Sequence, residues 1–427
     1  MCANETGADG TASRPNFVII LADDLGYGDL GCFGNSQVAT PHIDRLAEEG
    51  ALFTDFHSSG AVCSPTRAGL LTGRYQQRAG IPGVIAADPR RGLRHQGLQP
   101  HEVTFADVLR AAGYATAICG KWHLGYEKRY NPVRHGFDSF RGYVSGNVDY
   151  FSHIDQAGFA DWWHDETLVA EEGYTTRLIT QHAVRFLEAN AHRPFCLYVA
   201  HEAVHSPYQG PNDWPVRDGS GHRAERRDRV QAYREMTEEL DRGVGSLVAT
   251  LARLGIAEQT LVFFFSDNGA VQIGSNGVLR GGKGTLWEGG HRIPAIARWP
   301  GRIPAGRRCA AQSISLDLMP TMLALAGAAA PDRPLDGVDL SPVLFGTGSL
   351  RARDLFWEHG EARAMRRSRW KLIAQEAAGV QLFDLDADLC EQSDVAQQHQ
   401  AVVAEMMEQL RGWHREVWAG ATVQPAP

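Results

Sequence analysis

A cysteine and an arginine lie four residues apart in a segment that predicts the start of a helix. Residues 63–67 read C-S-P-T-R, with Cys63 and Arg67 at the two ends. Ser64 suits a helix N-cap, and Pro65 suits the first helical position. Cys63 then precedes a helix N-terminus, where backbone N–H groups and the helix dipole favour an anion. Because Arg67 projects back toward the same place, we expect an anion site here; an ordinary helix cap with a buried thiol is the alternative.

Two apolar runs each end in a pair of oxygen-bearing side chains. Residues 17–22 and 260–266 predict buried strands, the second with almost no polar residue. In a doubly wound sheet the carboxyl ends of such strands form the ligand crevice, so the two pairs are expected to meet. Either acidic end alone is also compatible with a helix cap or a turn. Carboxylate and amide oxygens suit calcium or magnesium and not zinc. The predicted metal ligands are Asp23, Asp24, Asp267 and Asn268.

Basic side chains follow a third predicted strand and lie in a glycine-rich loop. Lys121 and His123 come after an apolar run and are two apart, which places them on one face. Lys283 lies in the segment R-G-G-K-G-T, where glycines let the backbone approach a ligand. Glu288, five residues further on, is expected to be structural. A solvated lysine and a core histidine remain the alternative for Lys121 and His123.

Residues 201–205 read H-E-A-V-H and match the zinc-metalloprotease motif H-E-x-x-H. That motif binds zinc only on a helix, where the two histidines share one face. Here an apolar strand is predicted directly before His201, and Pro207 follows His205 by two residues. We therefore expect a strand end that enters a loop, and a zinc protease is a disfavoured alternative.

Taken in order along the chain, these segments resemble the type I sulfatases of the alkaline phosphatase superfamily. The resemblance runs from residue 15 to about residue 385 and includes C-x-P-x-R with L-T-G-R after it, and G-K-W-H-L-G around Lys121. It also includes the loop of Lys283 and a histidine before a proline, which His205 fits. In that family the cysteine of C-x-P-x-R is converted to formylglycine. A thiolate is a poor partner for a hard cation, whereas a hydrated aldehyde carries two hydroxyls.

The resemblance implies hydrolysis of a sulfate ester through formylglycine at Cys63, beside a bound calcium or magnesium ion that Cys63 also ligates. His205 would protonate the leaving alcohol, and His123 would help to deprotonate the second hydroxyl of the hydrate. Arg67, Lys121 and Lys283 would together neutralise the negative charge of the sulfuryl group during its transfer. The implied catalytic residues are Cys63, Arg67, Lys121, His123, His205 and Lys283. The implied partners are a sulfated small molecule or carbohydrate as substrate and the formylglycine-generating enzyme during maturation.

Two alternatives come from relatives of the same superfamily. Phosphonate or phosphate diester hydrolases also carry C-x-P-x-R in some cases, and a non-catalytic glycan-binding relative would be expected to lose Cys63 or a metal acid. The sequence departs from the usual family pattern at His42, where Asn is common, and at Leu389 and Cys390, where Pro-Gly is common. These departures lie away from the predicted site and concern loops.

A tyrosine-rich segment offers candidates for substrate binding. Residues 142–153 resemble a region near the pocket of sulfatases that act on N-acetylgalactosamine sulfates. Polar side chains there could bond sugar hydroxyls, and aromatic ones could stack on a ring face. A structural hairpin is the alternative. The polar candidates are Asn147, Asp149 and His153, and the aromatic ones are Tyr150, Trp162 and Trp163.

Apolar strands alternate with helical patterns, which predicts an α/β fold with a mostly parallel sheet covered by helices on both faces. The resemblance implies the alkaline phosphatase-like fold, with a small C-terminal antiparallel sheet and helix. We expect a flexible tail over residues 1–14, a catalytic domain over 15–335 and a C-terminal α+β subdomain over 336–427. Further predicted helices cover residues 40–50, 105–112, 175–190, 229–254 and 402–418, and further strands 114–119, 195–200, 369–373 and 381–385.

Composition narrows the class of protein. The chain has 427 residues, 43% of them hydrophobic, and a net charge of -8 without a basic stripe, so no nucleic-acid partner is expected. No apolar run reaches the length of a membrane span. Seven cysteines form no metal spacing and no evident disulfide framework. The N-terminus has no export-signal pattern, which predicts a cytoplasmic protein as written, or a periplasmic or extracellular one if a signal was removed.

Overall fold

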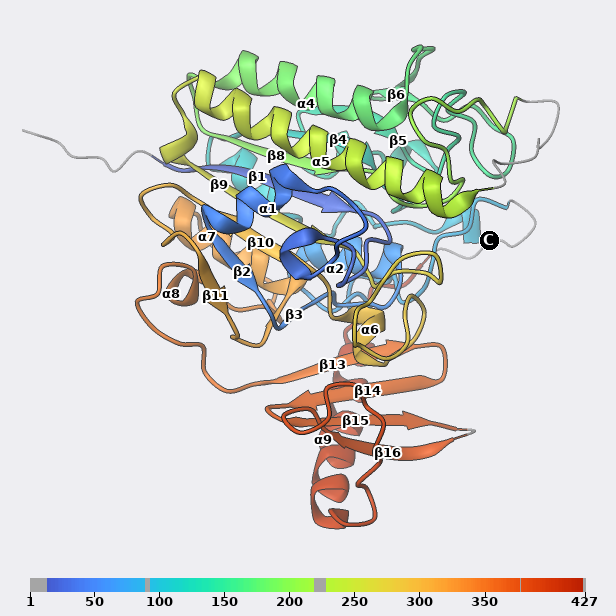
Figure 1. The fold of residues 1–427 in the computed structure, drawn as a ribbon, viewed down its shortest axis with the longest axis vertical. Coiled ribbons are helices and arrows are strands. Elements are labelled where there is room, and N and C mark those ends of the chain that lie inside the picture. Colours follow the sequence, from blue (N-terminus) through green and yellow to red (C-terminus); the bar gives the residue numbers. More distant parts are fainter. Residues whose placement is uncertain (1–13, 89–92, 219–227, 377, 425–427) are drawn as a thin grey trace, which may run out of the picture.

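The computed structural model describes residues 14–88, 93–218, 228–376 and 378–424. All but the last residue of the predicted N-terminal tail therefore lies outside the described residues. A ten-stranded sheet crosses the larger part of the molecule (Figure 1), in the order β11-β2-β10-β9-β1-β8-β4-β5-β6-β7. Its strands are β1 (Asn16–Ala22), β2 (Ala51–Phe53), β4 (Ala115–Lys121), β5 (Ser139–Tyr143), β6 (Trp163–His164), β7 (Thr167–Leu168), β8 (Phe195–Ala200), β9 (Thr260–Ser266), β10 (Ala295–Arg298) and β11 (Arg307–Cys309).

The centre of this sheet is parallel. Strand β1 lies between β8 and β9 and is parallel to both, and β4 is parallel to β8 and β5. Antiparallel pairs occur toward the edges, where β10 meets β9 and β2, and β6 meets β5 and β7. The carboxyl ends of β1, β4, β8 and β9 thus share one edge of the sheet, as predicted for a doubly wound fold. A two-stranded pair, β3 (Phe56–His57) with β12 (Ser313–Ile314), lies beside it.

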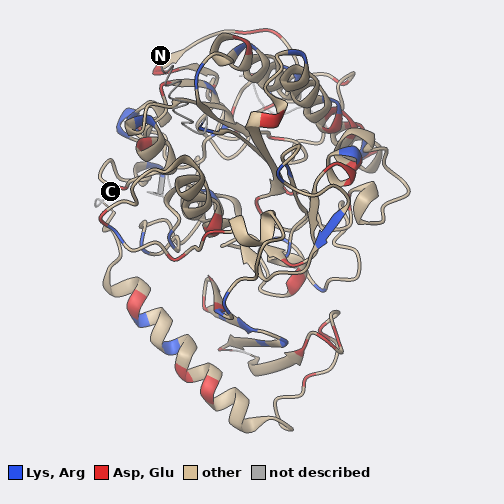
Figure 2. Cartoon of the chain, turned by 90° about the vertical axis from the view of Figure 1, so that its left-hand side faces the viewer, with Lys and Arg blue, Asp and Glu red and all other residues tan. Residues whose placement is uncertain are grey.

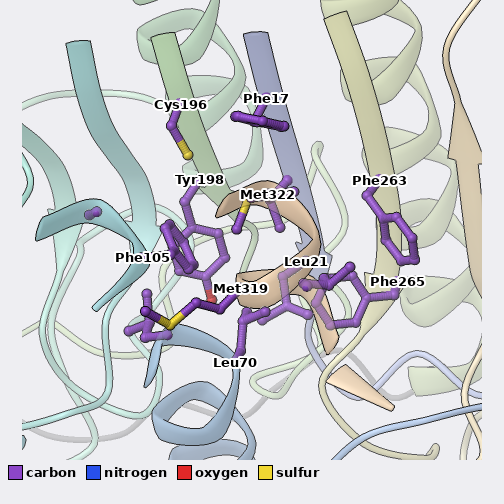
Figure 3. Close-up of a cluster of buried hydrophobic side chains, with 14 of the residues drawn as sticks. Phe17, Leu21, Leu70, Phe105, Cys196, Tyr198, Phe263, Phe265, Met319 and Met322 are labelled. Carbon is purple, nitrogen blue, oxygen red and sulfur yellow. The ribbon is translucent and has the colours of Figure 1, made fainter. Parts of the chain in front are cut away.

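Helices cover both faces of the sheet, and strands β1, β8 and β9 are therefore buried on both sides. On β1, Phe17 and Leu21 belong to the hydrophobic cluster that contains Leu70 and Met319 (Figure 3). Val18 and Ile20 belong to a second cluster on the opposite face. The helices of the first face are α2 (Cys63–Thr72), α3 (Phe105–Ala111) and α7 (Leu318–Ala326), and those of the second are α1 (Pro41–Glu48), α4 (Thr175–Asn190) and α5 (Arg229–Arg253).

Shorter helical segments connect these layers. Two are single-turn α-helices, α6 (Glu288–His291) and α8 (Ser341–Leu344). The others are 3-10 segments at Gly31–Phe33, Leu93–His95, Lys128–Tyr130, Pro132–Arg134, Ala257–Gln259 and Ser315–Asp317.

The C-terminal part forms a second, smaller layer pair (Figure 1). Four antiparallel strands, in sequence order, pack against one long helix, and Leu382 and Met406 meet in their shared core. Figure 2 shows both acidic and basic residues along that helix. Its buried residues, Met406, Leu410, Trp413 and Val417, recur every three or four positions, so the helix is amphipathic. The predicted small antiparallel sheet and closing helix are confirmed, with two strands that the sequence did not reveal. The elements are β13 (Asp354–His359), β14 (Ala362–Arg367), β15 (Trp370–Gln375), β16 (Gly379–Asp384) and α9 (Gln400–Ala419).

The chain between the two parts packs with the large sheet. Leu340, Val343 and Leu344 are buried in the same cluster as Phe17. The predicted division after residue 335 stays a prediction, and by packing the residues through α8 lie with the catalytic sheet. Of the helices that the structure describes, none combines the length and the apolar character that a membrane span needs.

Candidate active site

Acidic side chains from two neighbouring strands meet at the carboxyl edge of the sheet. Ala22 of β1 pairs with Ser266 of β9, so the residues that follow these strands are side by side. The backbone N–H of Asp24 donates to Asp267 Oδ1 at 3.2 Å, and Asn268 Nδ2 donates to Asp24 Oδ1 at 2.8 Å. Asp24 has a φ of 63°, a left-handed conformation that turns the chain sharply at the strand end. All four predicted metal ligands, including Asp23, are buried.

Cys63 is the first residue of α2, and Val62 is its N-cap. The expectation that Ser64 caps this helix is wrong, because the helix begins two residues earlier than predicted and the Ser64 Oγ accepts a hydrogen bond from the Ile85 N–H at 3.1 Å. Cys63 therefore lies within the first turn, among the backbone N–H groups that have no partner inside a helix. Its sulfur and one oxygen each of Asp23 and Asp267 all lie within 4.8 Å of one another. Burial raises the pKa of the Cys63 thiol.

Three cations face the three carboxylates. Lys121, the last residue of β4, places its Nζ 2.5 Å from Asp23 Oδ2. Arg67, from the second turn of α2, donates to Asp267 Oδ2 at 2.8 Å. The third cation, Lys283, lies 2.7 Å from Asp24 Oδ1 and keeps 18% of its side chain exposed, whereas the other two are fully buried. We call these six residues the catalytic cluster: Asp23, Asp24, Arg67, Lys121, Asp267 and Lys283.

The two adjacent carboxyls have opposite pKa shifts. Burial and then the neighbouring Asp267 raise the pKa of Asp23 to about 7. Burial also disfavours the charged form of Asp24, but Lys283 and His205 outweigh it and hold the pKa of Asp24 below its usual range. Negative charge is therefore crowded around Asp23, which is what a site for a cation requires.

Two histidines border the cluster, and their hydrogen bonds assign their tautomers. His205 Nδ1 donates to the Ser206 carbonyl oxygen at 2.7 Å, which leaves Nε2 with a lone pair 3.7 Å from Asp24 Oδ2. His123 has a φ of 57°, and its Nε2 donates to the Ile85 carbonyl oxygen at 3.0 Å, so Nδ1 is the basic atom. Burial lowers the pKa of His205 to about 3, with Lys283 contributing, and lowers the pKa of His123 as well.

Several buried polar atoms of this site have no hydrogen-bond partner among the described residues. They are Asp23 Oδ1, Asn268 Oδ1, Arg67 Nε and His123 Nδ1. Such atoms are costly unless a ligand satisfies them. The two oxygens, with the carboxylates of Asp24 and Asp267, make an oxygen-only donor set that fits calcium or magnesium. The residues present thus fit a hard divalent cation.

The H-E-x-x-H segment does not form a zinc site. Residues 201–205 follow β8 as a loop and are not helical. His201 is fully buried, and neither of its ring nitrogens has a partner among the described residues. His205 instead joins Asp23 and Asp24. The physical reason is that Ala200 ends a sheet strand, so the two histidines never share a helical face.

The tyrosine-rich segment makes many internal hydrogen bonds, and those of Asp149 favour the structural alternative for this residue. Tyr150 is buried and donates to the His205 carbonyl oxygen at 2.9 Å. Trp162 is buried against His153, with ring centroids 4.5 Å apart, so each ring covers a face of the other. Trp163 donates to Asp161. Both oxygens of Asp149 are already occupied, accepting from the N–H groups of Phe151, Ser152, Val216 and Arg217 and from Gln209 Nε2.

Asn147 differs from Asp149. Its Oδ1 is buried without a hydrogen-bond partner among the described residues, as is Nε2 of His153. The residue before it, Gly146, lies against the His123 ring so closely that a Cβ there would come within 2.8 Å of Nε2. Asn147 is therefore the member of the predicted substrate set that the structure brings beside the cluster. Sequence reasoning missed Ile85, which holds His123 through its backbone and so leaves no signal in its side-chain type.

The fold and its strand-end site define the class of protein, an alkaline phosphatase-like α/β enzyme. The chain belongs to the sulfatase family, since the sequence model of that family matches residues 15–328. A second model, described as the C-terminal part of N-sulphoglucosamine sulphohydrolase, matches residues 282–416. The predicted family and fold are thereby confirmed, and the chain is a sulfuric ester hydrolase.

Individual relatives support the assignment of the chain to the sulfatase family. N-acetylgalactosamine-6-sulfatase of the dog, Canis lupus familiaris, is 39% identical over 381 residues, which cover 83% of this chain and 70% of the relative. Human arylsulfatase A is 40% identical over 374 residues, covering 81% and 71%. The crystal structure of Ps i-CgsB in complex with k-i-k-neocarrahexaose superimposes with a TM-score of 0.86 at 30% identity, covering 97% of this chain and 94% of the other.

Proposed function

We propose that this sulfatase hydrolyses a sulfate ester of a carbohydrate, with formylglycine derived from Cys63 as its nucleophile and a calcium ion beside it. The observation that carries this proposal is the position of Cys63. It lies in the first turn of α2, in one group with Asp23 and Asp267, and three cations surround the group. Magnesium has the same donor preference and is the second candidate for the ion.

The residues that would hold the ion are Asp23, Asp24, Asp267 and Asn268, together with the modified residue 63. When bound, the cation supplies Lewis-acid stabilisation of negative charge. Formylglycine supplies a hydroxyl nucleophile in its hydrated form, which the buried neutral thiol of Cys63 does not offer.

The cations of the catalytic cluster bind the sulfate group. Lys121, Lys283 and Arg67 converge on the carboxylates from separate elements, so their ammonium and guanidinium groups are fixed before the substrate arrives. Preorganised charges aimed at a developing negative charge are usually the largest single contribution to such catalysis. Lys283, the most exposed of the three, would contact the ester oxygen of the leaving group.

The two histidines carry the protons. His205 Nε2 is the free ring atom facing Asp24, and in the protonated imidazolium form it would give its proton to the leaving alcohol. Its pKa is lowered by burial and by Lys283, and an anionic sulfate beside Nε2 would oppose that shift. His123 Nδ1 would accept the proton of the second hydroxyl, because its other nitrogen is committed to the Ile85 carbonyl oxygen.

A carbohydrate substrate is supported by the relatives and by Asn147. The dog relative is an N-acetylgalactosamine-6-sulfatase, and i-CgsB was solved with a neocarrahexaose. The unpartnered Oδ1 of Asn147 beside the His123 loop suits a sugar hydroxyl. We also infer that the formylglycine-generating enzyme acts on C-x-P-x-R during maturation. The catalytic domain that we predicted over residues 15–335 would extend through α8, and the C-terminal subdomain would begin after it.

Mass spectrometry of the Cys63 peptide tests the nucleophile. In protein produced together with a formylglycine-generating enzyme, we expect formylglycine at residue 63 and turnover of sulfate esters in proportion to its occupancy. Cys63→Ala should fold normally and lose turnover. Full activity in protein that carries only unmodified cysteine would contradict the proposal.

A substrate panel tests the ester class. Sulfated galactose and N-acetylgalactosamine should have a higher kcat/KM than 4-nitrocatechol sulfate, because side chains set for hydroxyls are left unsatisfied by a bare aryl group. A phosphonate monoester and a phosphate diester belong in the same panel. If either of these is the best substrate, the alternative hydrolase of this superfamily is correct.

A further inference from the structure

The loop that presents Lys283 is closed on itself at its base. The Gly289 N–H donates to the Arg280 carbonyl oxygen at 2.8 Å, so residues 280–289 form one compact excursion. Within it, the Lys283 N–H donates to the Ala270 carbonyl oxygen at 3.1 Å, and the side chain reaches Asp24. The position of the Lys283 ammonium therefore depends on how the base of this loop is held.

A single residue of the C-terminal part holds both ends of that base. Arg280 donates from its NH1 to the Glu391 carbonyl oxygen at 2.6 Å. The Glu288 N–H donates to the Glu391 carboxylate, at Oε2, at 2.7 Å. Glu391 is fully buried and has a φ of 53°, a conformation in which the carbonyl and the side chain of one residue both reach the loop.

The C-terminal sheet also neutralises the carboxylate of Glu288. Lys371 of β15 places its Nζ 2.8 Å from Oε1, and Arg366 of β14 places its NH1 3.2 Å from Oε2. Glu288 and Lys371 are fully buried, so neither charge can exchange its partner for water. Nearby, the Arg280 guanidinium lies 3.7 Å above the Trp287 ring, which continues the same contact surface.

We propose that Glu391 is a positioning residue of the active site, through which the C-terminal subdomain fixes the loop that presents Lys283 to the sulfate ester. This inference rests on the proposed role of Lys283 and deepens it. The subdomain is then part of the catalytic machinery, because it sets the position of a group that touches the substrate. Displacing a charged group by about 1 Å is enough to cost on the order of 100-fold in rate.

A double-mutant cycle tests this assignment. Glu391→Ala removes the side-chain acceptor for the Glu288 N–H. With rates normalised to the formylglycine content of each protein, it should lower kcat by 10- to 100-fold on 4-nitrocatechol sulfate. In a Lys283→Ala background the same change should lower kcat by less than 3-fold, because the group that it positions is gone. Equal losses in both backgrounds would overturn the proposal. Glu391→Gln keeps an acceptor oxygen and should recover most of the activity.

Asp394→Ala is the matched control. Asp394 lies in the same segment and accepts from the Leu382 and Ala396 N–H groups, but it does not bond the Lys283 loop. Its loss should lower stability and leave kcat within 2-fold of the wild-type protein. If Glu391→Ala does not fold, the exposed Arg280 replaces it as the site of mutation, with Arg280→Gln removing the second tether.

Hydrogen exchange supplies a readout that needs no turnover. Amides of residues 282–289 should exchange faster in Glu391→Ala or Arg280→Gln, and not in Asp394→Ala. Unchanged exchange together with wild-type kcat would refute the positioning role while leaving the sulfatase assignment intact. Absence of sulfate ester turnover in the fully modified wild-type protein would instead refute the proposed function, and faster exchange would still support the tether.

Discussion

Two buried clusters of ionisable side chains occur in this fold, and they differ in how many of their polar atoms have hydrogen-bond partners. The catalytic cluster and its neighbours leave Asp23 Oδ1, Asn268 Oδ1 and Arg67 Nε without hydrogen-bond partners among the described residues. The second group, which we call the joint cluster, lies where the C-terminal sheet meets the large domain. It consists of Asp55, His57, Glu288, His291, Arg366 and Lys371.

The joint cluster is a continuous chain of hydrogen bonds. Lys371 Nζ donates to His291 Nε2 at 2.9 Å, His291 Nδ1 to His57 Nδ1 at 3.0 Å, and His57 Nε2 to Asp55 Oδ1 at 2.8 Å. This is the one arrangement of protons in which both histidines are neutral and every ring nitrogen is used. Although His57, Glu288 and His291 have metal-binding geometry, the Lys371 ammonium already takes the cation's place.

The difference teaches how to tell a buried site that awaits a ligand from one that supports the fold. Both clusters carry carboxylates and cations in comparable number, and both are secluded from water. The catalytic cluster has crowded carboxylates with a raised pKa at Asp23, and atoms on several of its groups have no partner in the described part of the chain. In the joint cluster a cation faces each carboxylate, and the unpartnered oxygen at its border, Oε1 of Glu391, lies 3.6 Å from Lys371 Nζ. Polar networks that are fully satisfied rigidify a core, whereas partly satisfied ones cost stability and indicate a function.

The largest expected effect is a loss of kcat/KM when the carboxylate of Asp23 is removed. Asp23→Asn should lower kcat/KM by about 1,000-fold or more, close to 4 kcal/mol of transition-state stabilisation, because it removes a proposed metal ligand. The free energy of unfolding of the metal-free protein should fall less than after the loss of Lys371. Burial and Asp267 already disfavour the charged form of Asp23, which partly offsets the loss of its pair with Lys121. Steady-state kinetics and urea unfolding in EDTA measure the two quantities.

Calcium itself should separate the same variants. With free calcium at about 100 times its Kd, the wild-type protein should gain roughly 2.7 kcal/mol of stability over its EDTA-treated form, and Asp23→Asn should gain almost none. Asp29→Asn is the control, because Asp29 is a buried carboxyl that accepts from the Gly26 and Ser275 N–H groups and does not face the site. It should keep its calcium response. If calcium did not stabilise the wild-type protein, the proposal that the catalytic cluster binds this ion would be contradicted.

The opposite result is expected in the joint cluster. Lys371→Met should lower the free energy of unfolding by about 3–5 kcal/mol, because it leaves the Glu288 carboxylate buried beside one fewer cation. Urea unfolding measures the loss, and metal analysis should find the calcium content of the folded fraction unchanged. If instead Lys371→Met left stability intact and abolished calcium binding, the two clusters would have exchanged the roles assigned to them.

The proximity of the side chains in the catalytic cluster could be predicted from the sequence, because each member follows an apolar strand or stands in a short local motif. Asp23 and Asp267 end strands, and their meeting follows from the parallel sheet. The joint cluster was not predicted, since Lys371 and Glu288 are 83 positions apart and lie on elements whose packing no local pattern encodes. Glu391 was likewise missed, although it directly follows the Leu389 and Cys390 departure from the family pattern.

The substrate segment shows the same limit on a smaller scale. Residue type alone made Asn147 and Asp149 equal candidates for binding a sugar, yet Asp149 is saturated with donors and Asn147 is not. The number of N–H groups that reach a carboxylate depends on how three loops fold together. The sequence therefore indicated the segment, but it could not show that the oxygens of Asp149 are occupied by hydrogen bonds whereas Oδ1 of Asn147 is not.

These two residues give a prediction of intermediate size. Asn147→Ala should raise KM for a sulfated sugar by about 10-fold, roughly one hydrogen bond, with an unchanged kcat for 4-nitrocatechol sulfate. Asp149→Ala should lower the free energy of unfolding by about 3 kcal/mol, through buried N–H groups left unpaired, and keep the sugar KM within 3-fold. Kinetics on both substrates and thermal unfolding check the pair. The reverse pattern would make Asp149 the ligand-binding residue.

The smallest expected effect tests whether unpartnered polar atoms indicate a function wherever they occur. His201 has two such ring nitrogens, but no charged residue of the catalytic cluster bonds it, and burial alone lowers its pKa to about 3. A histidine whose pKa is lower in the folded than in the unfolded state binds fewer protons when folded. Its stabilising contribution is therefore present above pH 6.5 and is lost as the pH falls toward 3.

Between pH 8 and pH 5 this single group should cost the wild-type protein about 2 kcal/mol of stability, since each unit of pKa difference is worth about 1.4 kcal/mol. His201→Leu should remove that part of the pH dependence and keep kcat/KM within 3-fold. Urea unfolding at the two pH values isolates the effect, because all other histidines titrate equally in both proteins. A variant that lost activity 100-fold with the pH dependence unchanged would place His201 in the reaction, and spare polar atoms would then indicate function without exception.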